Sequence, residues 1–227
     1  MTIRVVAITD VSLLGDDPRA AFARAVEGCP AGSVMIQIRA KHLDGGPLLA
    51  LARAAAETGF PMAINDRVDV ALAARIPNVV AVHLPENGLS ITDVRSLGIQ
   101  SLEATLGMGG RALTIGVSRH SIDGVAEAVE QGADVVQLGP IWDTPTKGPA
   151  LGTGSLATAR HHIELSGRAC RLVAVGGIDS PARAREAVLG GAHAVALIRA
   201  AWTGGSLLPY VTAVDDALAF RDLRADR

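Results

Sequence analysis

The sequence predicts an α/β fold in which residues 1–227 form one domain, a closed (β/α)8 barrel of the TIM type. Short apolar, β-branched runs alternate with Ala-rich segments of helical pattern along the whole chain, which is the signature of repeated βα units. Eight such units fit into the chain at a mean spacing of about 28 residues, as in the smallest barrels of this type. No linker, low-complexity segment or charge run divides the chain.

Each expected strand is an apolar run bounded by Gly, Pro, Asp or Asn, and an expected helix follows each one. The strands are Arg4–Ile8, Ser33–Arg39, Met62–Ile64, Val79–His83, Thr114–Gly116, Val135–Leu138, Leu172–Val175 and Ala194–Leu197. The helices are Pro18–Gly28, Pro47–Thr58, Arg67–Ala74, Ile91–Leu106, Ile122–Gln131, Ser155–Leu165, Pro181–Leu189 and Leu207–Leu223. The stretch from Leu97 to Arg111 is the least regular part and is expected to form an elongated connection.

Internal similarity supports closure of the barrel. The segment from Gln131 to Leu138 resembles the segment from Gly190 to Leu197, and each has a glycine at a helix end before a buried parallel strand. An open doubly wound sheet is the competing architecture. It would need a G-x-G-x-x-G motif after the first strand, and the chain from Ile8 to Ser12 contains none.

The composition argues against nucleic acid and membranes as partners. The chain has 21 Lys and Arg against 23 Asp and Glu, a formal net charge of −2, and its basic residues are scattered. Nucleic-acid binding normally needs a basic face. The apolar runs, such as that from Val79 to Leu84, are far shorter than the roughly 20 residues of a membrane span. Cys29 and Cys170 lie far apart, which suits two buried thiols in a reducing cytoplasm.

Polar residues at the carboxyl ends of the strands are the first candidates for chemistry, since barrels of this type carry their active sites there. Gln37, Arg39 and Lys41 alternate with apolar residues, so we expect all three on one face of the second strand. Two cations in a concave site attract a polyanion such as pyrophosphate, and Arg adds bidentate geometry. Alternatively, Arg39 and Lys41 follow the strand into solvent.

Asn65 and Asp66 end the third strand and open a helix. Asp66 is a candidate ligand for a divalent cation such as Mg²⁺, which commonly uses one or two carboxylates together with phosphate oxygens. The plainer alternative is that Asn65 or Asp66 caps the helix.

The loop from Gly139 to Gly152 is long, polar and rich in turn-forming residues, as binding loops and lids of barrel enzymes often are. Thr144, Thr146 and Lys147 offer two hydroxyls and an ammonium group for an anionic or heteroaromatic ligand. A mobile surface loop without such a role is the alternative.

Two later segments complete a phosphate-site pattern. Gly176 and Gly177 end the seventh strand, and Ile198 and Arg199 follow the eighth. Barrels often bind phosphate with backbone N–H groups of these two loops, aided by a short helix N-terminus. Plain turns are the alternative.

His83 and His120 are the histidines that sequence position brings nearest to the barrel mouth, where either would be a candidate base. A packing or solvated role is the alternative for both. The chain contains no H-E-x-x-H motif, nucleophile elbow or P-loop, which excludes zinc hydrolases, serine esterases and P-loop NTPases.

Six motifs in order resemble the thiamine phosphate synthase/TenI superfamily, from the first strand to beyond the eighth. They are Gln37 to Lys41, Ile64 to Asp66, Gly116 to Ser118, Leu138 to Lys147, Val175 to Ile178 and Leu197 to Arg199. The resemblance implies a transferase that joins hydroxymethylpyrimidine diphosphate to thiazole phosphate in thiamine biosynthesis and releases pyrophosphate. The superfamily's reaction is dissociative: pyrophosphate leaves first, with help from Mg²⁺, and the thiazole nitrogen captures the pyrimidine-methylene cation.

The resemblance also implies a role for each matching residue. Pyrophosphate would be held by Arg39, Lys41 and Lys147, the residues expected to be catalytic. The pyrimidine and the leaving group would be positioned by Gln37, Asn65 and Ser118, and Mg²⁺ would be held by Asp66. The thiazole would face Thr144 and Thr146, and its phosphate would be received by Gly177, Ile198 and Arg199.

The chain departs from the superfamily pattern after the fourth strand. Synthases of the superfamily typically read H-x-G-Q-x-D there, and the final Asp is a second metal ligand. Here the chain reads His-Leu-Pro-Glu-Asn-Gly from His83 to Gly88, which places Gly88 at the aspartate position. Glu86 or Asn87 is the candidate substitute, with Glu86 the possible second metal ligand.

Two alternatives to the transferase follow. The His-Leu-Pro segment is closer to TenI-type paralogues, some of which are thiazole phosphate tautomerases. The tautomerase's proton-transferring His corresponds here to Pro140, so His83 or His120 would have to be the base. A non-catalytic binder or regulator of thiamine metabolites is the other alternative. A homo-oligomer also stays open, because Trp202, Leu207 and Leu208 could pack on the barrel or on a second copy.

Overall fold

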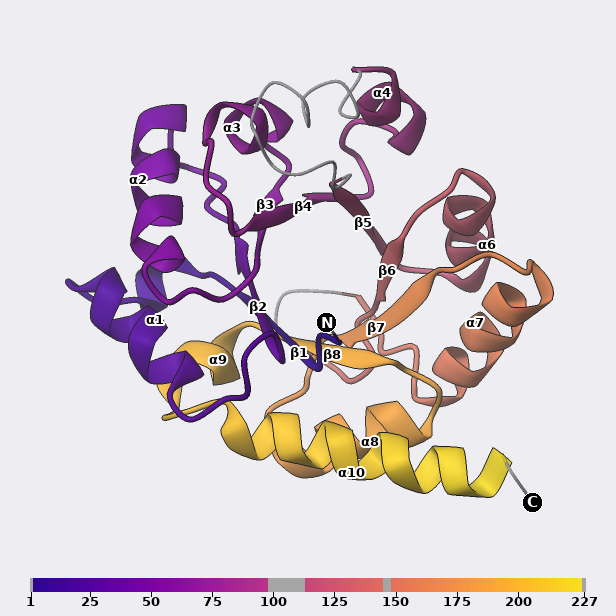
Figure 1. The fold of residues 1–227 in the computed structure, drawn as a ribbon. Helices are drawn as coiled ribbons and strands as arrows, with labels where there is room; N and C mark the ends of the chain where they lie inside the picture. Colours follow the sequence, from indigo (N-terminus) through magenta and orange to yellow (C-terminus); the bar gives the residue numbers. More distant parts are fainter. Residues whose placement is uncertain (1, 98–112, 145–147, 226–227) are drawn as a thin grey trace.

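The computed structural model describes residues 2–97, 113–144 and 148–225. Eight strands of this part of the chain pair in sequence order and close into a barrel, and every neighbouring pair is parallel. Helices surround the barrel (Figure 1). The predicted (β/α)8 barrel is confirmed.

All eight predicted strands are present, with small differences at their ends. They are β1 (Val5–Ile8), β2 (Val34–Ile38), β3 (Met62–Asn65), β4 (Val79–Leu84), β5 (Thr114–Arg119), β6 (Val135–Leu138), β7 (Arg171–Val175) and β8 (Ala194–Leu197). Their near-continuous apolar sequences reflect burial on both faces. The largest difference is that β5 continues to Arg119 instead of ending at Gly116, because Ser118 and Arg119 still pair with β6.

The predicted helices also occur, with similar ends. They are α1 (Pro18–Val26), α2 (Gly45–Ala56), α3 (Val68–Ala73), α4 (Ile91–Ser96), α6 (Ile122–Glu130), α7 (Gly154–Leu165), α8 (Pro181–Leu189) and α10 (Leu208–Ala225). The helix predicted from Ile91 to Leu106 is described only as far as α4, and most of the predicted elongated connection lies outside the described residues. Two further short helices are present. One is η1 (Val11–Leu13), which the sequence does not predict, and the other is α9 (Arg199–Thr203), where the sequence predicts only a helix-like turn from Ala200.

The core has two parts. The larger one lies between the barrel wall and the helices and contains most of the buried side chains of the described chain. The smaller one lies inside the barrel, where Val6, Ile8, Val173, Val175 and Ala196 form an apolar cluster with their neighbours. This cluster comes from β1, β7 and β8, and Met35 of β2 and Val135 of β6 pack against it.

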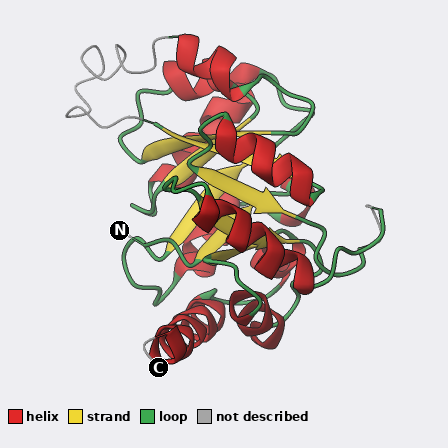
Figure 2. Ribbon diagram, turned by 90° about the vertical axis from the view of Figure 1, so that its right-hand side faces the viewer, coloured by secondary structure: helices red, strands yellow, loops and turns green. Residues whose placement is uncertain are grey.

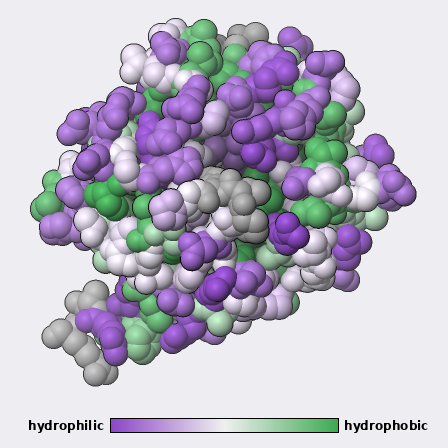
Figure 3. Space-filling view, turned by 180° about the vertical axis from the view of Figure 1, so that it is seen from behind, coloured by the Kyte–Doolittle hydropathy of each residue, from purple (hydrophilic) through white to green (hydrophobic). Residues whose placement is uncertain are grey.

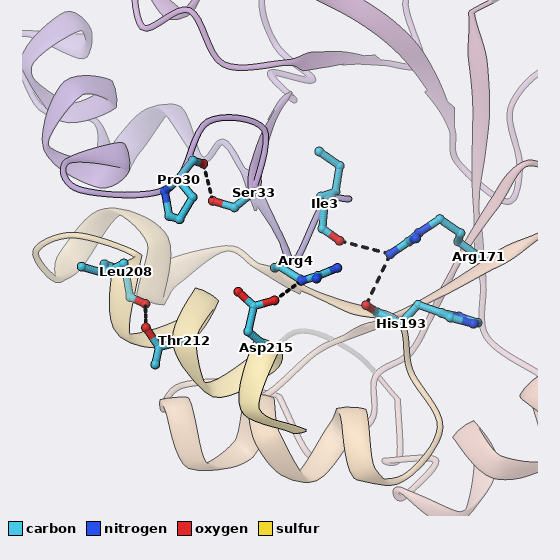
Figure 4. Close-up of polar contacts among 9 residues, drawn as sticks. All are labelled: Ile3, Arg4, Pro30, Ser33, Arg171, His193, Leu208, Thr212 and Asp215. Carbon is cyan, nitrogen blue, oxygen red and sulfur yellow. Dashed lines mark hydrogen bonds and ion pairs between the residues drawn. The ribbon is translucent and has the colours of Figure 1, made fainter. Parts of the chain in front are cut away.

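Polar contacts lie across the amino-terminal end of the barrel (Figure 4). Arg171, the first residue of β7, donates from Nη2 to the carbonyl oxygens of Ile3 at 3.2 Å and His193 at 3.5 Å. Arg4 forms an ion pair with Asp215 on α10, which joins the start of β1 to the last helix. These contacts connect β1, β7 and α10 at the amino-terminal end of the barrel, opposite to the carboxyl ends of the strands.

The last two helices pack on the barrel of the same chain. Trp202 of α9 is 4% exposed; its indole Nε1 donates to the carbonyl of Ile8 at 2.7 Å, and its ring forms a T-shaped contact with that of Phe22. Leu207 is also buried, whereas Leu208 is exposed. Two of the three residues considered for an interface are therefore covered within the chain. Within the described residues, none of the helices has the length and apolar character needed to cross a membrane.

Candidate active site

The carboxyl ends of the strands lie on the side of the molecule opposite to the N terminus (Figure 2). Figure 3 views this face and shows hydrophilic side chains gathered around a recess near its centre. The predicted site residues come from the strand ends and loops of this face.

Three amide side chains form a row inside the barrel below this face. Gln137 on β6 donates from Nε2 to Gln37 Oε1 at 2.7 Å, and Gln37 on β2 donates from Nε2 to Asn65 Oδ1 at 2.9 Å. Gln37 and Gln137 are buried, with 2% and 4% of their surface exposed. The structure brings Gln37 and Asn65 together and adds Gln137, which the sequence analysis missed. The available signal was a polar residue inside the otherwise apolar run of β6.

A histidine and a serine lie in the same half of the barrel interior. His83 of β4 is buried, and its Nε2 lies 2.9 Å from Ser118 Oγ on β5. Gly116 makes room for this imidazole, because a Cβ atom there would lie 2.8 Å from His83 Nδ1. The motif from Gly116 to Ser118 thus supplies both the space for His83 and its hydrogen-bond partner.

Arg39 and Lys41 do not continue the face of β2, contrary to the prediction. The strand ends at Ile38 because the buried hydroxyl of Thr9 forms hydrogen bonds with both the backbone N–H and the backbone carbonyl of Arg39. It accepts from Arg39 N at 2.7 Å and donates to Arg39 O at 2.8 Å. Arg39 is half-buried just past the strand end, and Lys41 is exposed in a turn. Among the described residues, neither cation is ion-paired with a carboxylate.

Asp66 directly follows β3 in a left-handed backbone conformation, with φ of 66°. Its backbone N–H donates to His83 O at 2.8 Å, which holds the turn against β4. Helix α3 begins at Val68, and its N-cap residue is Arg67, which makes no side-chain cap hydrogen bond. The alternative that Asn65 or Asp66 caps this helix is therefore wrong. Asp66 is exposed because Asn65 is drawn into the barrel and the chain turns sharply after it.

The loop after β4 brings Gly88 back to Asp66. A Cβ atom on Gly88 would lie 3.2 Å from Asp66 Oδ1, so the position that carries the second carboxylate in the superfamily pattern adjoins the first. Glu86, the candidate substitute, lies with Oε2 at 2.5 Å from His120 Nδ1. Its carboxylate is therefore engaged with the loop after β5.

The described residues fit a metal ion only in part. They contain no group of three or more His, Cys, Asp and Glu side chains placed to hold a metal. Asp66 remains as one exposed carboxylate at the mouth. One carboxylate is enough for a Mg²⁺ ion whose other ligands are phosphate oxygens and water. The residues present therefore fit an ion held together with a diphosphate.

The loops after β6 and β7 pack tightly on each other. Ile141 N donates to Val175 O at 3.0 Å, and Trp142 N donates to Gly176 O at 3.2 Å. Gly177 has φ of 71°, and a Cβ atom on it would lie 2.5 Å from Trp142 Cβ. Both the backbone conformation and this contact require glycine at 177.

Thr144 is the predicted thiazole-facing residue that the structure describes. Its hydroxyl oxygen is buried and has no hydrogen-bond partner among the described residues. A buried polar atom without a partner is uncommon in proteins and can mark a ligand position. Thr146 and Lys147 lie outside the described residues.

Arg183 on α8 contacts both the loop after β6 and the loop after β7. The sequence did not predict this role. Its Nη1 donates to Gly177 O at 2.7 Å, and its guanidinium lies 5.5 Å from the centre of the Trp142 ring. A single Arg in a helix carries no sequence signal for such a contact.

Ile198 and Arg199 lie at the start of α9. Ile198 precedes the first helical residue, and Arg199 is exposed. Helix α9 is held by the bond from Trp202 to Ile8, so its first turn lies at the barrel mouth, where free N–H groups favour an anion. No ion pair involves Arg199 within the described part of the chain.

Comparison with known proteins decides the family. A sequence model of the family described as "Thiamine monophosphate synthase" matches residues 5–201. The chain belongs to this family. It is 32% identical over 231 residues to a thiamine-phosphate synthase of Chloroflexus aurantiacus, with 98% of this chain and 91% of that protein covered. It is 35% identical over 225 residues to the corresponding protein of Mycolicibacterium smegmatis, with coverage of 91% and 86%.

A solved structure with a similar name has the same fold. The chain superimposes on a thiamine phosphate pyrophosphorylase from Pyrococcus furiosus with a TM-score of 0.72 at 23% identity, covering 95% of this chain and 97% of that one. As a member of the thiamine monophosphate synthase family, the protein is a transferase of thiamine phosphate synthesis. The predicted family and activity class are confirmed, and the relatives, named as synthases, do not favour the tautomerase alternative.

Proposed function

We propose that the protein joins hydroxymethylpyrimidine diphosphate to thiazole phosphate. The bond between the pyrimidine methylene carbon and the diphosphate oxygen breaks, and its electron pair leaves with pyrophosphate. The lone pair of the thiazole nitrogen then forms the new C–N bond of thiamine phosphate. The observation that carries this proposal is a row of three hydrogen-bonded amides, two of them buried, inside a barrel of this family whose strand β2 is directly followed by Arg39.

Positive charge at the mouth favours departure of pyrophosphate. Arg39 and Lys41 lie beyond the end of β2, and Lys147 joins them in this proposal on the strength of its motif. Negative charge grows on the bridging oxygen as the bond breaks, and fixed cations stabilise that charge more than they stabilise the substrate. Because Arg39 is half-buried, its field is less screened than that of an exposed cation.

Asp66 is the residue that would hold Mg²⁺. When bound there, the ion would supply further charge neutralisation for the diphosphate. Asp66 needs no partner carboxylate for this role, since the substrate itself brings oxygen ligands.

The amide row and Ser118 would bind and orient the pyrimidine. Gln37 and Asn65 are fixed by their mutual hydrogen bond, and Ser118 is fixed by His83. Preorganised groups of this kind lower the entropy loss on reaching the reactive geometry.

The opposite side of the mouth would receive thiazole phosphate. Gly177, Ile198 and Arg199 offer backbone N–H groups and a guanidinium for its phosphate. Thr144, with its unpaired buried hydroxyl, and Thr146 would face the ring. The two substrates would thus approach each other across the barrel axis.

We also propose a cytoplasmic location and only small-molecule substrates, without nucleic-acid or membrane partners. Cys29 and Cys170 are free thiols, and burial raises the pKa of both, that of Cys170 to about 12. Such thiols are packing groups of a reducing compartment. Sedimentation of the purified protein measures whether it forms a homo-oligomer.

The test is incubation of the purified protein with both substrates, with and without Mg²⁺, followed by detection of thiamine phosphate and pyrophosphate. We expect equal amounts of the two products and a rate that increases with Mg²⁺. A folded protein that forms no thiamine phosphate under these conditions would contradict the proposal.

A further inference from the structure

We propose that Arg183 is a positioning residue for thiazole phosphate, which acts by holding the peptide between Gly177 and Ile178. This inference deepens the proposed function and rests on it, because the proposed function places Gly177 at the phosphate. Arg183 fixes the direction of the backbone N–H groups that receive the phosphate. It acts through the loop after β7 and does not itself touch the substrate.

Two successive carbonyl groups of the loop after β7 have hydrogen-bond partners. Gly176 O accepts from Trp142 N at 3.2 Å, and Gly177 O accepts from Arg183 Nη1 at 2.7 Å. The direction of the second bond is fixed by chemistry, because a guanidinium only donates and a carbonyl only accepts. This contact therefore determines which way the carbonyl of Gly177 points.

The N–H groups of the same two peptides point the other way. Both peptides are trans, and in a planar trans peptide the N–H and C=O groups lie on opposite sides. The N–H of Gly177 therefore points away from Trp142 N, and that of Ile178 points away from the Arg183 guanidinium. Neither N–H group donates to another described residue. Successive free backbone N–H groups are a common site for anions.

Gly177 does not hold this arrangement by itself. With no Cβ atom and a φ of 71°, glycine leaves the following peptide free to turn over, which would present a carbonyl oxygen where the N–H now lies. An oxygen there would repel a phosphate. Within the described chain, Gly177 O has no hydrogen-bond donor besides Arg183. This arginine therefore holds the peptide in the orientation that binds an anion.

Arg183 is itself fixed in place. Its backbone N–H donates to Ser180 Oγ at 3.4 Å in the first turn of α8, and its guanidinium lies 5.5 Å from the centre of the Trp142 ring. Nη1 also donates to Asp179 Oδ2 at 2.9 Å. The Asp179 side chain is 69% exposed, and exposed ion pairs contribute little to stability. The bond to Gly177 O is thus the contact of Arg183 that has a consequence for the site.

The effect of Arg183 is specific to the phosphate group of the substrate. The corresponding thiazole alcohol lacks the phosphate, so its binding does not depend on the direction of the two N–H groups. General damage to the barrel mouth would weaken the binding of both compounds. The relative use of thiazole phosphate and thiazole alcohol therefore separates a positioning role from a loss of structure.

Two variants of Arg183 and one control test this role. Arg183→Met removes the donor and the charge but keeps a long apolar side chain. Arg183→Lys keeps the charge but replaces the planar fork by a flexible ammonium group, which is held less firmly on the Trp142 ring. Arg185→Met makes the first change at an exposed arginine of the same helix, whose guanidinium lies 5.9 Å from the centre of the Phe220 ring. It serves as the control.

The measurement is kcat/KM for thiazole phosphate and for thiazole alcohol, with hydroxymethylpyrimidine diphosphate at saturation. Calorimetric Kd values of both compounds give the same comparison where turnover of the alcohol is too slow to measure. We expect the phosphate-to-alcohol ratio to fall by about tenfold or more in Arg183→Met, because losing a hydrogen bond to a charged group weakens binding by that factor. The ratio should be intermediate in Arg183→Lys and should match the wild type in Arg185→Met. The KM for the pyrimidine diphosphate should be unchanged in all three variants.

The outcomes separate the two proposals. Absence of thiamine phosphate from the wild-type protein would contradict the proposed function, and the role of Arg183 would then be read from calorimetric binding of thiazole phosphate and the alcohol. A wild-type protein that binds neither compound would overturn both proposals. An unchanged phosphate-to-alcohol ratio in Arg183→Met, in kinetics or in binding, would overturn the positioning role. A wild-type ratio in Arg183→Lys would also overturn it, since charge alone would then be sufficient. If Arg183→Met fails to fold, the ratio in Arg183→Lys decides.

Discussion

Gly88 lies directly beside Asp66, so that a Cβ atom on Gly88 would be 3.2 Å from Asp66 Oδ1. The loop after β4 therefore retains the approach that would place two carboxylates together, although only one carboxylate is present at these two positions. The same Cβ atom would lie 2.9 Å from Pro85 Cδ, so the ring of Pro85 crowds any side chain at 88.

We predict that Gly88→Asp strengthens Mg²⁺ activation. A second carboxylate next to Asp66 adds an oxygen ligand for the ion, so the Mg²⁺ concentration for half-maximal rate should fall by about tenfold, or about 1.4 kcal/mol. The contact with Pro85 should lower the free energy of unfolding by about 1–3 kcal/mol. Gly88→Asn is the control for size, and it should destabilise without improving Mg²⁺ activation. Equal effects of Asn and Asp would contradict the assignment.

A second prediction concerns Asp66 itself. Asp66→Asn removes the charge but keeps a residue that tolerates the left-handed backbone, so the fold should be retained. We expect kcat to fall on the order of 100-fold and the response to Mg²⁺ to disappear. Asp66→Gly should unfold at the same or a higher temperature than the wild type, because glycine adopts a φ of 66° without strain, and it should be as inactive. Substantial Mg²⁺-dependent turnover in both variants would exclude Asp66 as the ligand.

The sequence could predict the barrel because each βα unit repeats a local pattern. Alternating apolar runs and turn residues are visible within about 28 residues, and closure follows from the number of units. The short helix α9 lacked such a pattern. It is held by a bond between Trp202 and Ile8, residues far apart in the chain, and a helix of five residues has little periodicity of its own.

The positions of site residues could be predicted where their motif lies on a strand. They could be predicted less well where a residue far away in the sequence determines the position. Gln37 and Asn65 could be placed because they belong to strand ends. The end of β2 could not be predicted, because it depends on Thr9, the residue after β1, whose hydroxyl forms hydrogen bonds with both backbone groups of Arg39. Gln137 was missed because one polar residue in a buried strand gains meaning only from its partner, Gln37, across the barrel.

A third prediction concerns the glycine at 177. Gly177→Ala should lower the free energy of unfolding by about 2–4 kcal/mol, since it adds both backbone strain and a contact with Trp142. The KM for thiazole phosphate should rise, while that for the pyrimidine should change little. Gly15→Ala is the matched control, because Gly15 has φ of 69° but nothing within 4 Å of its Cβ position. It should show only the backbone cost, about 1–2 kcal/mol; equal losses would contradict the steric argument.

The last prediction concerns His193 at the amino-terminal end of the barrel. Burial, reinforced by Arg160, Arg171 and Arg221, lowers the pKa of His193 to about 4. Its Nδ1 accepts a hydrogen bond from Leu172 N at 3.0 Å, which requires the neutral ring.

Because the folded pKa lies below the unfolded one, the unfolded chain binds more protons between about pH 6.5 and pH 4. The free energy of unfolding should therefore fall as pH decreases through this window, by about 2 kcal/mol between pH 7 and pH 5. His193→Asn keeps an acceptor for Leu172 N but does not titrate, so urea unfolding of this variant should lose most of that pH dependence. The same substitution at the exposed His161 should leave the wild-type slope intact. A slope that survives in His193→Asn would show that another group is responsible.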